Sequence, residues 1–489
     1  MGLFSRDSYK IKNGICTVNF EKAGELTEER AKKILDIKEV KACQSIAVNI
    51  GKKVTAIGKS AFASRKSITT VSLSEGLVSI GDTAFFDCKG IDSIIIPNSV
   101  ESIGKYAFAY CYGLKSIYIP ISVELIDASI FADSFKTTIY CEASDLPSGW
   151  NKLWNSKKLL DSWDFNNDSE KIPSIFGIDG FGITESGLVW ASTKDYALIC
   201  NYIGSANEVT IPAQINGKTI SAIQDWAFYE SSIETITIPE GVEAIGINAF
   251  TQCASLERIS LPNSVSRIGD YAFNNCQRLK EVELPKGLIS MGKNIFEESG
   301  DIESISVDED NEQYKSIDGS LYTKDGKVLI KYAGSKSKFV VPNGVTVIGS
   351  HAFAYCNSLE SVIISRGVLE IGESAFSDCS GLESVTFNDD LKSIEYRAFY
   401  NCYNLKNVTI PECVSSIGEY AFCSCEALES IVIPKSVTAI GENAFEDCFN
   451  LTISCELSEP AEGWSKDWNP DFLSVIWRYD QPKGKTINY

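Results

Sequence analysis

The stretch IDSIIIPNSVESIGKYAFAYC, residues 91–111, contains the pattern that decides the fold. Ile94 and Ile96 are two positions apart, which places both side chains on the same face of a β-strand. Pro97 lacks the N–H that a sheet ladder needs, so it ends the strand, and Gly104 provides a bend. The Ala-Phe-x-x-Cys segment that follows has the spacing of an apolar stripe on a helical turn. The stretch therefore predicts a unit of strand, bend, helical turn and second bend.

This unit recurs along the chain with a period of 23 residues. An Ala-Phe or Ile-Phe pair marks 13 copies, and Ile or Met stands five residues before each Phe. One unit cannot bury its apolar side alone, whereas units stacked at the strand spacing of about 4.8 Å bury a continuous column. The sequence therefore predicts a solenoid of 13 stacked coils. The repeated phenylalanines are Phe62, Phe85, Phe108, Phe131, Phe228, Phe250, Phe273, Phe296, Phe353, Phe376, Phe399, Phe422 and Phe445.

The repeated motif Ile-x-Ile-Pro-x-x-Val-x-x-Ile-Gly-x-x-Ala-Phe-x-x-Cys resembles the BspA-like class of leucine-rich repeat. The resemblance covers residues 50–165 and 182–480. It implies a leucine-rich-repeat solenoid of the α/β horseshoe type, with one short parallel β-strand and one helical turn in each 23-residue coil and the sheet on the concave side. Many members of this class are cell-surface or secreted proteins of bacteria and some protozoa, implicated in binding host proteins or other cells. The resemblance therefore implies a role in adhesion.

Two copies of one Trp-rich ending predict where the arrays of coils stop. The spacing Cys-x8-Trp-x3-Trp-x8-Trp begins at Cys141 and again at Cys455. The last coil of a stack needs a cover for its apolar layer, and large indole rings suit that purpose. The sequence therefore predicts two capped arrays. Their expected bounds are 1–165 for the first array with an N-terminal cap, 166–181 for a linker, 182–480 for the second array and 481–489 for a tail.

Two segments depart from the repeat. Near the start, Thr27 precedes Glu28-Glu29 and is expected to open a helix of the N-terminal cap, with Ala31, Ile34 and Leu35 facing inward. In the second array, 57 residues instead of 23 separate two successive repeat phenylalanines. Strand-forming residues flank an Asp-Gly turn there, which predicts an inserted β-hairpin near 301–340.

The cysteines follow the repeat. Nine of the sixteen lie three residues after a repeat Phe, and Ser134, Ser231 and Ser299 take that place in other coils. Neighbouring coils would bring the Cα atoms to about 5 Å, within disulfide range, but equivalent side chains point in parallel. We predict small buried free thiols, with ladder disulfides as the alternative. A second alternative is a soft-metal site at Cys402, Cys423, Cys425 and Cys448.

Groups suited to catalysis are scarce in the sequence. His351 is the only histidine, and dissimilar residues occupy the equivalent place in other coils, which predicts a surface position without a catalytic role. The sequence predicts no catalytic residue, no cofactor and no metal ligand set, so we expect that the protein is not an enzyme. The least favoured alternative is an enzyme that uses the inserted segment. Its candidate residues are Asp308, Asp310, Tyr314 and Asp318.

The residue between the two inward apolar positions of each strand must point out of the sheet. Most residues in this outward column are small and polar, and four larger apolar ones are candidate binding anchors: Ile95, Tyr118, Ile363 and Val432. A flat, weakly charged concave face suits docking of a protein, or of a glycan, better than catalysis. The alternative is that β-branched residues stand there because they favour strands.

Charge and hydropathy limit the partners. Asp and Glu outnumber Lys and Arg by 65 to 45, and the net charge of −20 disfavours nucleic acid and anionic bilayers. No apolar run is long enough to predict membrane insertion, and the first residues do not resemble a signal peptide, which favours a cytoplasmic location. The resemblance implies the cell surface or secretion instead. The sequence thus predicts a non-catalytic protein- or glycan-binding repeat protein, with an intracellular structural or scaffold protein as the alternative.

Overall fold

The structure is a computed structural model that describes residues 7–12, 14–152, 154–155, 174–300 and 302–479. The chain divides into two compact units. Unit 1 comprises Met1–Ser205 with Pro212–Phe228, and unit 2 comprises Ala206–Ile211 with Tyr229–Tyr489. Residues 166–173 of the expected linker, the expected tail at 481–489 and Trp163 lie outside the described residues.

Each unit is a β-solenoid whose coils carry two short strands. In the coil quoted above these are β8 (Ser93–Ile95) and β9 (Ser102–Ile103). Strand β8 pairs in parallel with β10 (Ser116–Ile119), and Ile94 lies opposite Ile117, one repeat further on. Ile94 and Ile96 are both buried, as their two-residue spacing predicts. The sequence did not predict the second strand of each coil, because a two-residue strand leaves no periodic pattern.

In the first part of unit 1, up to β13, the longer strands form two sheets and the short strands form a third. The first sheet contains β1 (Ser8–Lys12), β2 (Ile15–Phe20), β4 (Ser45–Ile50) and β6 (Ile68–Leu73). The second contains β8, β10, β12 (Thr138–Cys141) and β13 (Ser174–Ile175). The third contains β3 (Gly24–Leu26), β5 (Val54–Ile57), β7 (Ser79–Ile80), β9 and β11 (Leu125–Ile126). Further strands of this unit are β14 (Gly180–Ile183), β15 (Leu188–Ser192), β16 (Ala197–Tyr202), β18 (Gln214–Ile215) and β19 (Lys218–Ile223).

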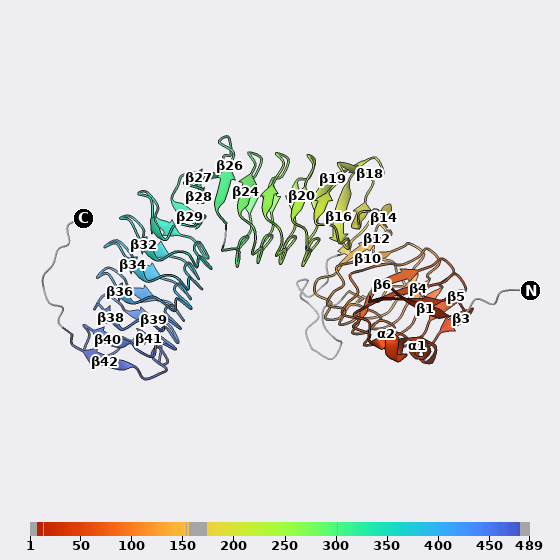
Figure 1. Cartoon of the computed structure of the whole chain (residues 1–489), viewed down its shortest axis with the longest axis horizontal. Helices are drawn as coiled ribbons and strands as arrows, with labels where there is room; N and C mark the ends of the chain where they lie inside the picture. The colour runs from red at the N-terminus through yellow and green to blue at the C-terminus, as the bar shows by residue number, and fades with distance from the viewer. Residues whose placement is uncertain (1–6, 13, 153, 156–173, 301, 480–489) are drawn as a thin grey trace, which may run out of the picture. The chain divides into compact units, whose positions relative to one another are not determined.

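Unit 2 repeats the two-ladder arrangement over more coils, and Figure 1 shows its strands side by side. The first longer strands are β17 (Glu208–Thr210), β20 (Thr235–Thr237), β22 (Arg258–Ser260), β24 (Glu281–Leu284) and β26 (Ser304–Val307). A seven-stranded sheet of longer strands follows, with β30 (Lys338–Val340), β32 (Ser361–Ile363), β34 (Ser384–Thr386), β36 (Asn407–Thr409), β38 (Ser430–Ile433), β40 (Thr452–Cys455) and β42 (Ser474–Trp477).

The short strands of unit 2 form the second ladder. Those before the insertion are β21 (Ala244–Ile245), β23 (Arg267–Ile268) and β25 (Ser290–Met291). The inserted segment contributes β27 (Tyr314–Ile317), β28 (Ser320–Thr323) and β29 (Val328–Lys331). The same sheet continues through the short strands β31 (Val347–Ile348), β33 (Glu370–Ile371), β35 (Ser393–Ile394), β37 (Ser416–Ile417), β39 (Ala439–Ile440) and β41 (Gly463–Trp464).

The inserted segment contains two antiparallel hairpins. Strands β27 and β28 meet at Asp318-Gly319, and β28 and β29 are joined through Asp325-Gly326. Asp318, Gly319 and Gly326 have positive φ values, which Asp-Gly turns accommodate at low cost. Strand β29 then pairs in parallel with β31, so the chain leaves the insertion within the short-strand ladder.

The two α-helices among the described residues lie near the start of unit 1, at α1 (Glu28–Leu35) and α2 (Lys38–Lys41). The hydroxyl of Thr27 accepts a hydrogen bond from the N–H of Arg30 at 3.2 Å, which satisfies one free donor of the first helical turn. Ala31, Ile34 and Leu35 are buried in the hydrophobic core of this unit. The start of this helix and its inward face are therefore confirmed.

The helical turn expected in each coil was wrong. In the coil quoted above, Tyr106 and Tyr110 have φ values of 57° and 58°, which no α-helix contains, and the equivalent residues of all 13 coils share this conformation. Backbone groups bond to the next coil instead, with the N–H of Phe108 donating to the carbonyl of Ile130 at 2.8 Å. The inter-coil hydrogen bonds thus offset the cost of two left-handed residues in each coil.

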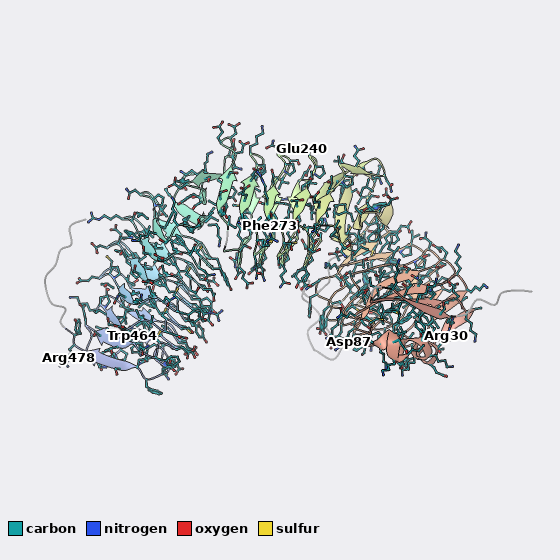
Figure 2. The ribbon with its side chains drawn as sticks, in the orientation of Figure 1. Arg30, Asp87, Glu240, Phe273, Trp464 and Arg478 are labelled. Atoms are coloured by element: carbon teal, nitrogen blue, oxygen red, sulfur yellow. The ribbon has the colours of Figure 1, made fainter. Side chains whose placement is uncertain are left out.

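The repeated phenylalanines form columns of stacked rings inside each unit. In unit 2 the centroids of Phe353, Phe376 and Phe399 follow one another at 4.5 and 5.0 Å, with planes within 8°. Side chains fill the space between the ribbons around Phe273, labelled in Figure 2. Two of the runs end against the edge of a tryptophan, where Phe131 meets Trp154 and Phe445 meets Trp468.

The cysteine column hydrogen-bonds one coil to the previous one. The thiol of Cys402 donates to the carbonyl of Phe376 at 3.1 Å, and Cys88, Cys111, Cys276, Cys379, Cys425 and Cys448 make the equivalent bond to a repeat Phe. Ser134 and Ser299 donate in the same way at 2.9 Å. All sixteen cysteines are free thiols, as predicted. Residues in this column therefore need a small side chain that can donate a hydrogen bond. A residue that only filled space would need no donor.

Contact between coils also explains the glycines that follow the short strands. Gly104 lies outside the left-handed region, so its φ does not require glycine. A Cβ atom there would lie 2.6 Å from the backbone nitrogen of Asp82 in the previous coil. The bend expected at Gly104 is therefore a close approach of two coils, which excludes any side chain.

We expect Phe399→Ala to destabilise unit 2 by about 3–5 kcal/mol, because the cavity loses contacts with the rings on both sides. The exposed Phe449 provides a matched control, and its alanine variant should stay within about 0.5 kcal/mol of the parent. Urea unfolding followed by circular dichroism measures both. Equal losses of stability in the two variants would contradict the stacked column.

The thiol hydrogen bond is tested by replacing Cys402 with Ala and with Ser. The alanine variant leaves the buried carbonyl of Phe376 with only the N–H of Cys379 at 3.3 Å, and the lost thiol hydrogen bond costs about 0.5–1.5 kcal/mol. The serine variant keeps a donor and should unfold at a higher urea concentration than the alanine variant. If the alanine variant is at least as stable as the serine variant, the cysteine column is only a filler.

Candidate binding surface

The structure places the four candidate anchors on the outward side of the longer strands. Ile95 and Tyr118 lie in β8 and β10 of unit 1, as register partners. Ile363 and Val432 lie in β32 and β38 of unit 2. Ile363 is 46% exposed, while the other three are partly exposed.

Tyr118 is engaged within unit 1. Its ring stacks on Phe181 of β14 at 5.2 Å, and Phe181 also contacts Tyr140 at 5.6 Å. Burial raises the pKa of Tyr118 above its usual value, and the carboxylate of Glu142 beside it raises this pKa further. The phenol therefore stays neutral, and part of the area assigned to an anchor is covered by Phe181.

In unit 2 the outward residues of neighbouring strands form one continuous row. Ile363 lies opposite Thr386 of the next strand, and Thr409 lies opposite Val432. The row ends at Ile476, which is 50% exposed, in β42. A second row beside it carries only Ser, Thr and Asn: Ser361, Ser384, Asn407, Ser430, Thr452 and Ser474.

We call the outward positions of β32, β34, β36, β38, β40 and β42 the neutral strand face. None of its twelve residues is charged, in a chain whose net charge is −20. The same positions in earlier strands of unit 2 do carry charges, where Arg258 pairs with Glu281 at 3.3 Å and also with Glu283. The absence of charge is thus a local property of these six strands.

A charged rim borders the neutral strand face. Glu360, Glu383, Lys406 and Glu429 each stand directly before a strand, and all four are exposed. Lys406 and Glu383 pair at 2.9 Å, and exposed pairs of this kind contribute little to stability. These exposed charged residues therefore form one edge of the face.

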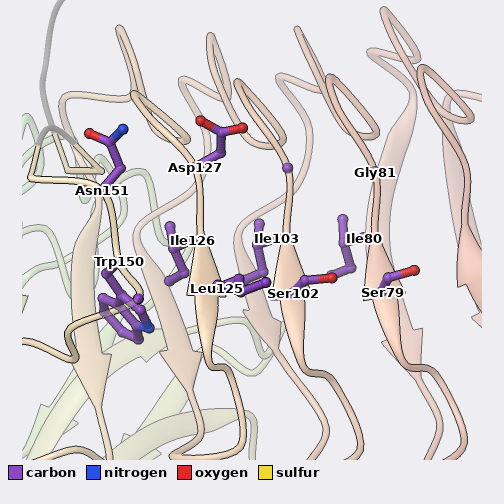
Figure 3. Close-up of a pocket in the computed structure, with 12 residues that line it drawn as sticks. Ser79, Ile80, Gly81, Ser102, Ile103, Leu125, Ile126, Asp127, Trp150 and Asn151 are labelled. Atoms are coloured by element: carbon purple, nitrogen blue, oxygen red, sulfur yellow. The ribbon is translucent and has the colours of Figure 1, made fainter.

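Unit 1 has a surface groove on its short-strand ladder (Figure 3). It is a shallow groove of about 550 Å³ that crosses β7, β9 and β11. Ile80, Ile103 and Ile126 turn their side chains into the core, which leaves glycine backbone, Leu125 and Asp127 at the surface. The groove does not bring an acid, a base and a nucleophile together. It is therefore better suited to contact with another molecule than to catalysis.

The surface position predicted for His351 was wrong. Its side chain is only 12% exposed, and Nε2 donates to the carboxylate of Glu297 at 3.1 Å. Its sequence column suggested exposure because the residue types in it vary, but the equivalent residues of most other coils are half-buried as well. His351 lies in the coil that follows the inserted segment and reaches Glu297 of the coil before it, while its own N–H bonds regularly to the carbonyl of Glu373 in the next coil.

The remaining candidates for chemistry do not form a reactive group. Burial raises the pKa of Cys141 and of Cys423 to about 12, so these thiols stay protonated at neutral pH. Asp308 accepts the N–H of Asp310 at 2.9 Å, which closes a local turn in the inserted segment.

Within the described ranges, no three His, Cys, Asp or Glu side chains are placed to hold a metal ion. Nor does any helix there have the length and apolar character needed to cross a membrane.

Comparison with solved structures finds other repeat proteins at low sequence identity. A leucine rich cell surface protein from Faecalibacterium prausnitzii A2-165 is 23% identical, with 97% of this chain and 94% of that chain covered and a TM-score of 0.48. The pneumococcal vaccine antigen PcpA is 18% identical, with 97% of both chains covered and a TM-score of 0.49. A leucine-rich repeat protein from Bacteroides ovatus ATCC 8483 is 22% identical, with 97% of this chain and 99% of that chain covered and a TM-score of 0.35.

Among curated proteins, no significant match was found. The model of the BspA type leucine rich repeat region matches residues 37–147, 199–323 and 330–452. These residues make up most of the chain and include its regular coils. The chain belongs to the BspA-type leucine-rich repeat family.

Proposed function

We propose that the protein is a non-catalytic binding protein that docks another protein on the neutral strand face of unit 2. The single observation that carries this proposal is the lack of charge on six consecutive strands. Cores of protein interfaces are depleted of charged residues, and a face without them loses little on desolvation. In a strongly acidic chain, such a face is the part that another macromolecule can cover at the lowest cost.

Ile363 and Val432 are the anchors in this proposal. Exposed apolar side chains that sit among small hydroxyl residues can enter pockets of a partner, while the small residues allow close approach. The acidic rim then orients a partner that carries positive charge around its own apolar patch. Ile95 and Tyr118 remain proposed anchors of a second contact on unit 1, where Phe181 already covers part of Tyr118.

A glycan is the other partner to consider for the same face. Ser, Thr and Asn side chains can hydrogen-bond sugar hydroxyls, but the outward rows lack the aromatic rings that stack on sugars. We therefore favour a protein ligand. The two capped arrays that end at the tryptophan clusters also remain part of the proposal, with recognition surfaces on both arrays.

The proposed setting is adhesion or interaction at the cell surface. Sixteen free thiols favour the alternative of an intracellular scaffold, since reducing compartments keep cysteines unpaired. Fractionation of the native cells separates the two settings, because a surface protein is labelled by a membrane-impermeant reagent and a scaffold is not.

The binding face is tested with the double variant Ile363→Asp and Val432→Asp. The full chain is immobilised and used to capture proteins from an extract of cells that its host contacts, and the affinity of any captured protein is then measured. Loss of two anchors should weaken binding by about 30-fold or more, the effect of a hot spot of about 2 kcal/mol.

The matched control is Ile289→Asp, another exposed apolar residue of unit 2 that lies away from this face. It should bind as tightly as the parent, and all variants should melt at the same temperature. Unchanged affinity of the double variant would refute the neutral strand face as the binding site. Binding that disappears when glycans are removed from the captured protein would identify a glycan ligand instead.

A further inference from the structure

A small cavity in unit 2 lies beside the inserted segment. It has a volume of about 50 Å³. One side is formed by residues from Met291 to Glu297, and the other side by Ile330, Lys331, Ser350 and His351. Because a water molecule takes up about 30 Å³ of liquid, the cavity admits a ligand of only a few atoms.

Lys331 occupies the place that the repeat usually gives to alanine. The N–H of Tyr332 donates to the carbonyl of Ala352 at 2.8 Å, as the N–H of Phe353 donates to that of Ala375. Tyr332 therefore stands in the Phe column and Lys331 in the preceding Ala position. Lys331 is only 3% exposed, so a long charged side chain replaces a buried methyl group. Departures from a local rule of this kind are expected at functional sites.

The amine of Lys331 has one hydrogen-bond acceptor, the carbonyl of Ala354 at 3.3 Å. Burial lowers the pKa of Lys331, which shifts the amine toward its neutral form. The carboxylate of Glu297, which also lines the cavity, is engaged by His351. A buried neutral lysine is a nucleophile for carbonyl carbon.

His351 provides a base in the same cavity. In the neutral tautomer that donates from Nε2 to the carboxylate of Glu297, the lone pair lies on Nδ1. Nδ1 is buried and has no hydrogen-bond partner. Buried polar atoms are nearly always paired, so an unpaired imidazole nitrogen beside a cavity indicates a missing partner.

We propose that the cavity takes up carbon dioxide and that Lys331 is converted to a carbamate. The lone pair of Nζ forms the new N–C bond, and one C=O electron pair moves onto oxygen. The amine proton passes to Nδ1 of His351. The product is a carbamate anion next to an imidazolium that still donates to Glu297, and no electron is gained or lost overall.

The test uses the full chain incubated with ¹³C-labelled bicarbonate in equilibrium with carbon dioxide. Carbamates are fixed by alkylation with a trialkyloxonium salt, and the peptides are then assigned by mass spectrometry. We expect one labelled carbon on Lys331, loss of that label in Lys331→Met, and an unchanged label in Lys338→Met, an exposed lysine of β30. In His351→Gln the occupancy should fall by about 10-fold or more, the size expected when a hydrogen bond to a charged group is lost.

The results that overturn the proposal are an unlabelled Lys331 in the parent chain, or label spread equally over exposed lysines. A label that survives unchanged in His351→Gln overturns the role of the imidazole. Melting temperatures show whether Lys331→Met is folded. If it is not, the site assignment in the parent chain and the His351→Gln variant decide the question.

Discussion

Hydrogen bonding between successive coils is the constraint on which the structure depends. The N–H of Phe108 reaches the carbonyl of Ile130, and the thiol of Cys111 reaches back to the carbonyl of Phe85. These bonds require that each coil present the same backbone groups at the same height as its neighbours, about 4.8 Å apart. Constant coil length, left-handed residues at two turns and glycine at the closest approach all follow from that requirement.

Much of this fold could be predicted from sequence, because the stacked coils repeat their side chains. The spacing of Ile94 and Ile96 predicted the inward face of the longer strands, and the Phe register predicted the ring column. The helical turn was wrong because the bonds that hold Tyr106 and Tyr110 in the left-handed region lead to another coil, which a local pattern cannot reveal. The two-residue strands were not predicted because they are too short to leave a periodic pattern.

The candidate surface could be predicted less well than the fold. Sequence period identifies which residues point outward, and Ile363 and Val432 do so. It does not indicate what covers them, and Phe181 lies against Tyr118 through contacts that no 23-residue pattern encodes. The neutral strand face becomes visible only when six strands are placed in register, since its lack of charge belongs to the row and not to any one coil.

The inserted segment shows what happens when the repeat is interrupted. In the other coils the position before Phe holds a buried apolar residue, which is alanine in most of them and isoleucine at Ile130 and Ile295. At Lys331 the adjoining coil is displaced in sequence by the insertion, and a long side chain, a histidine and a carboxylate enter the space. The surface place predicted for His351 fails for a more general reason, because the equivalent residues of most coils are half-buried too. An interruption of the repeat can thus bring a lysine, a histidine and a carboxylate to one buried place, because the residues that meet there come from segments that do not share the 23-residue register.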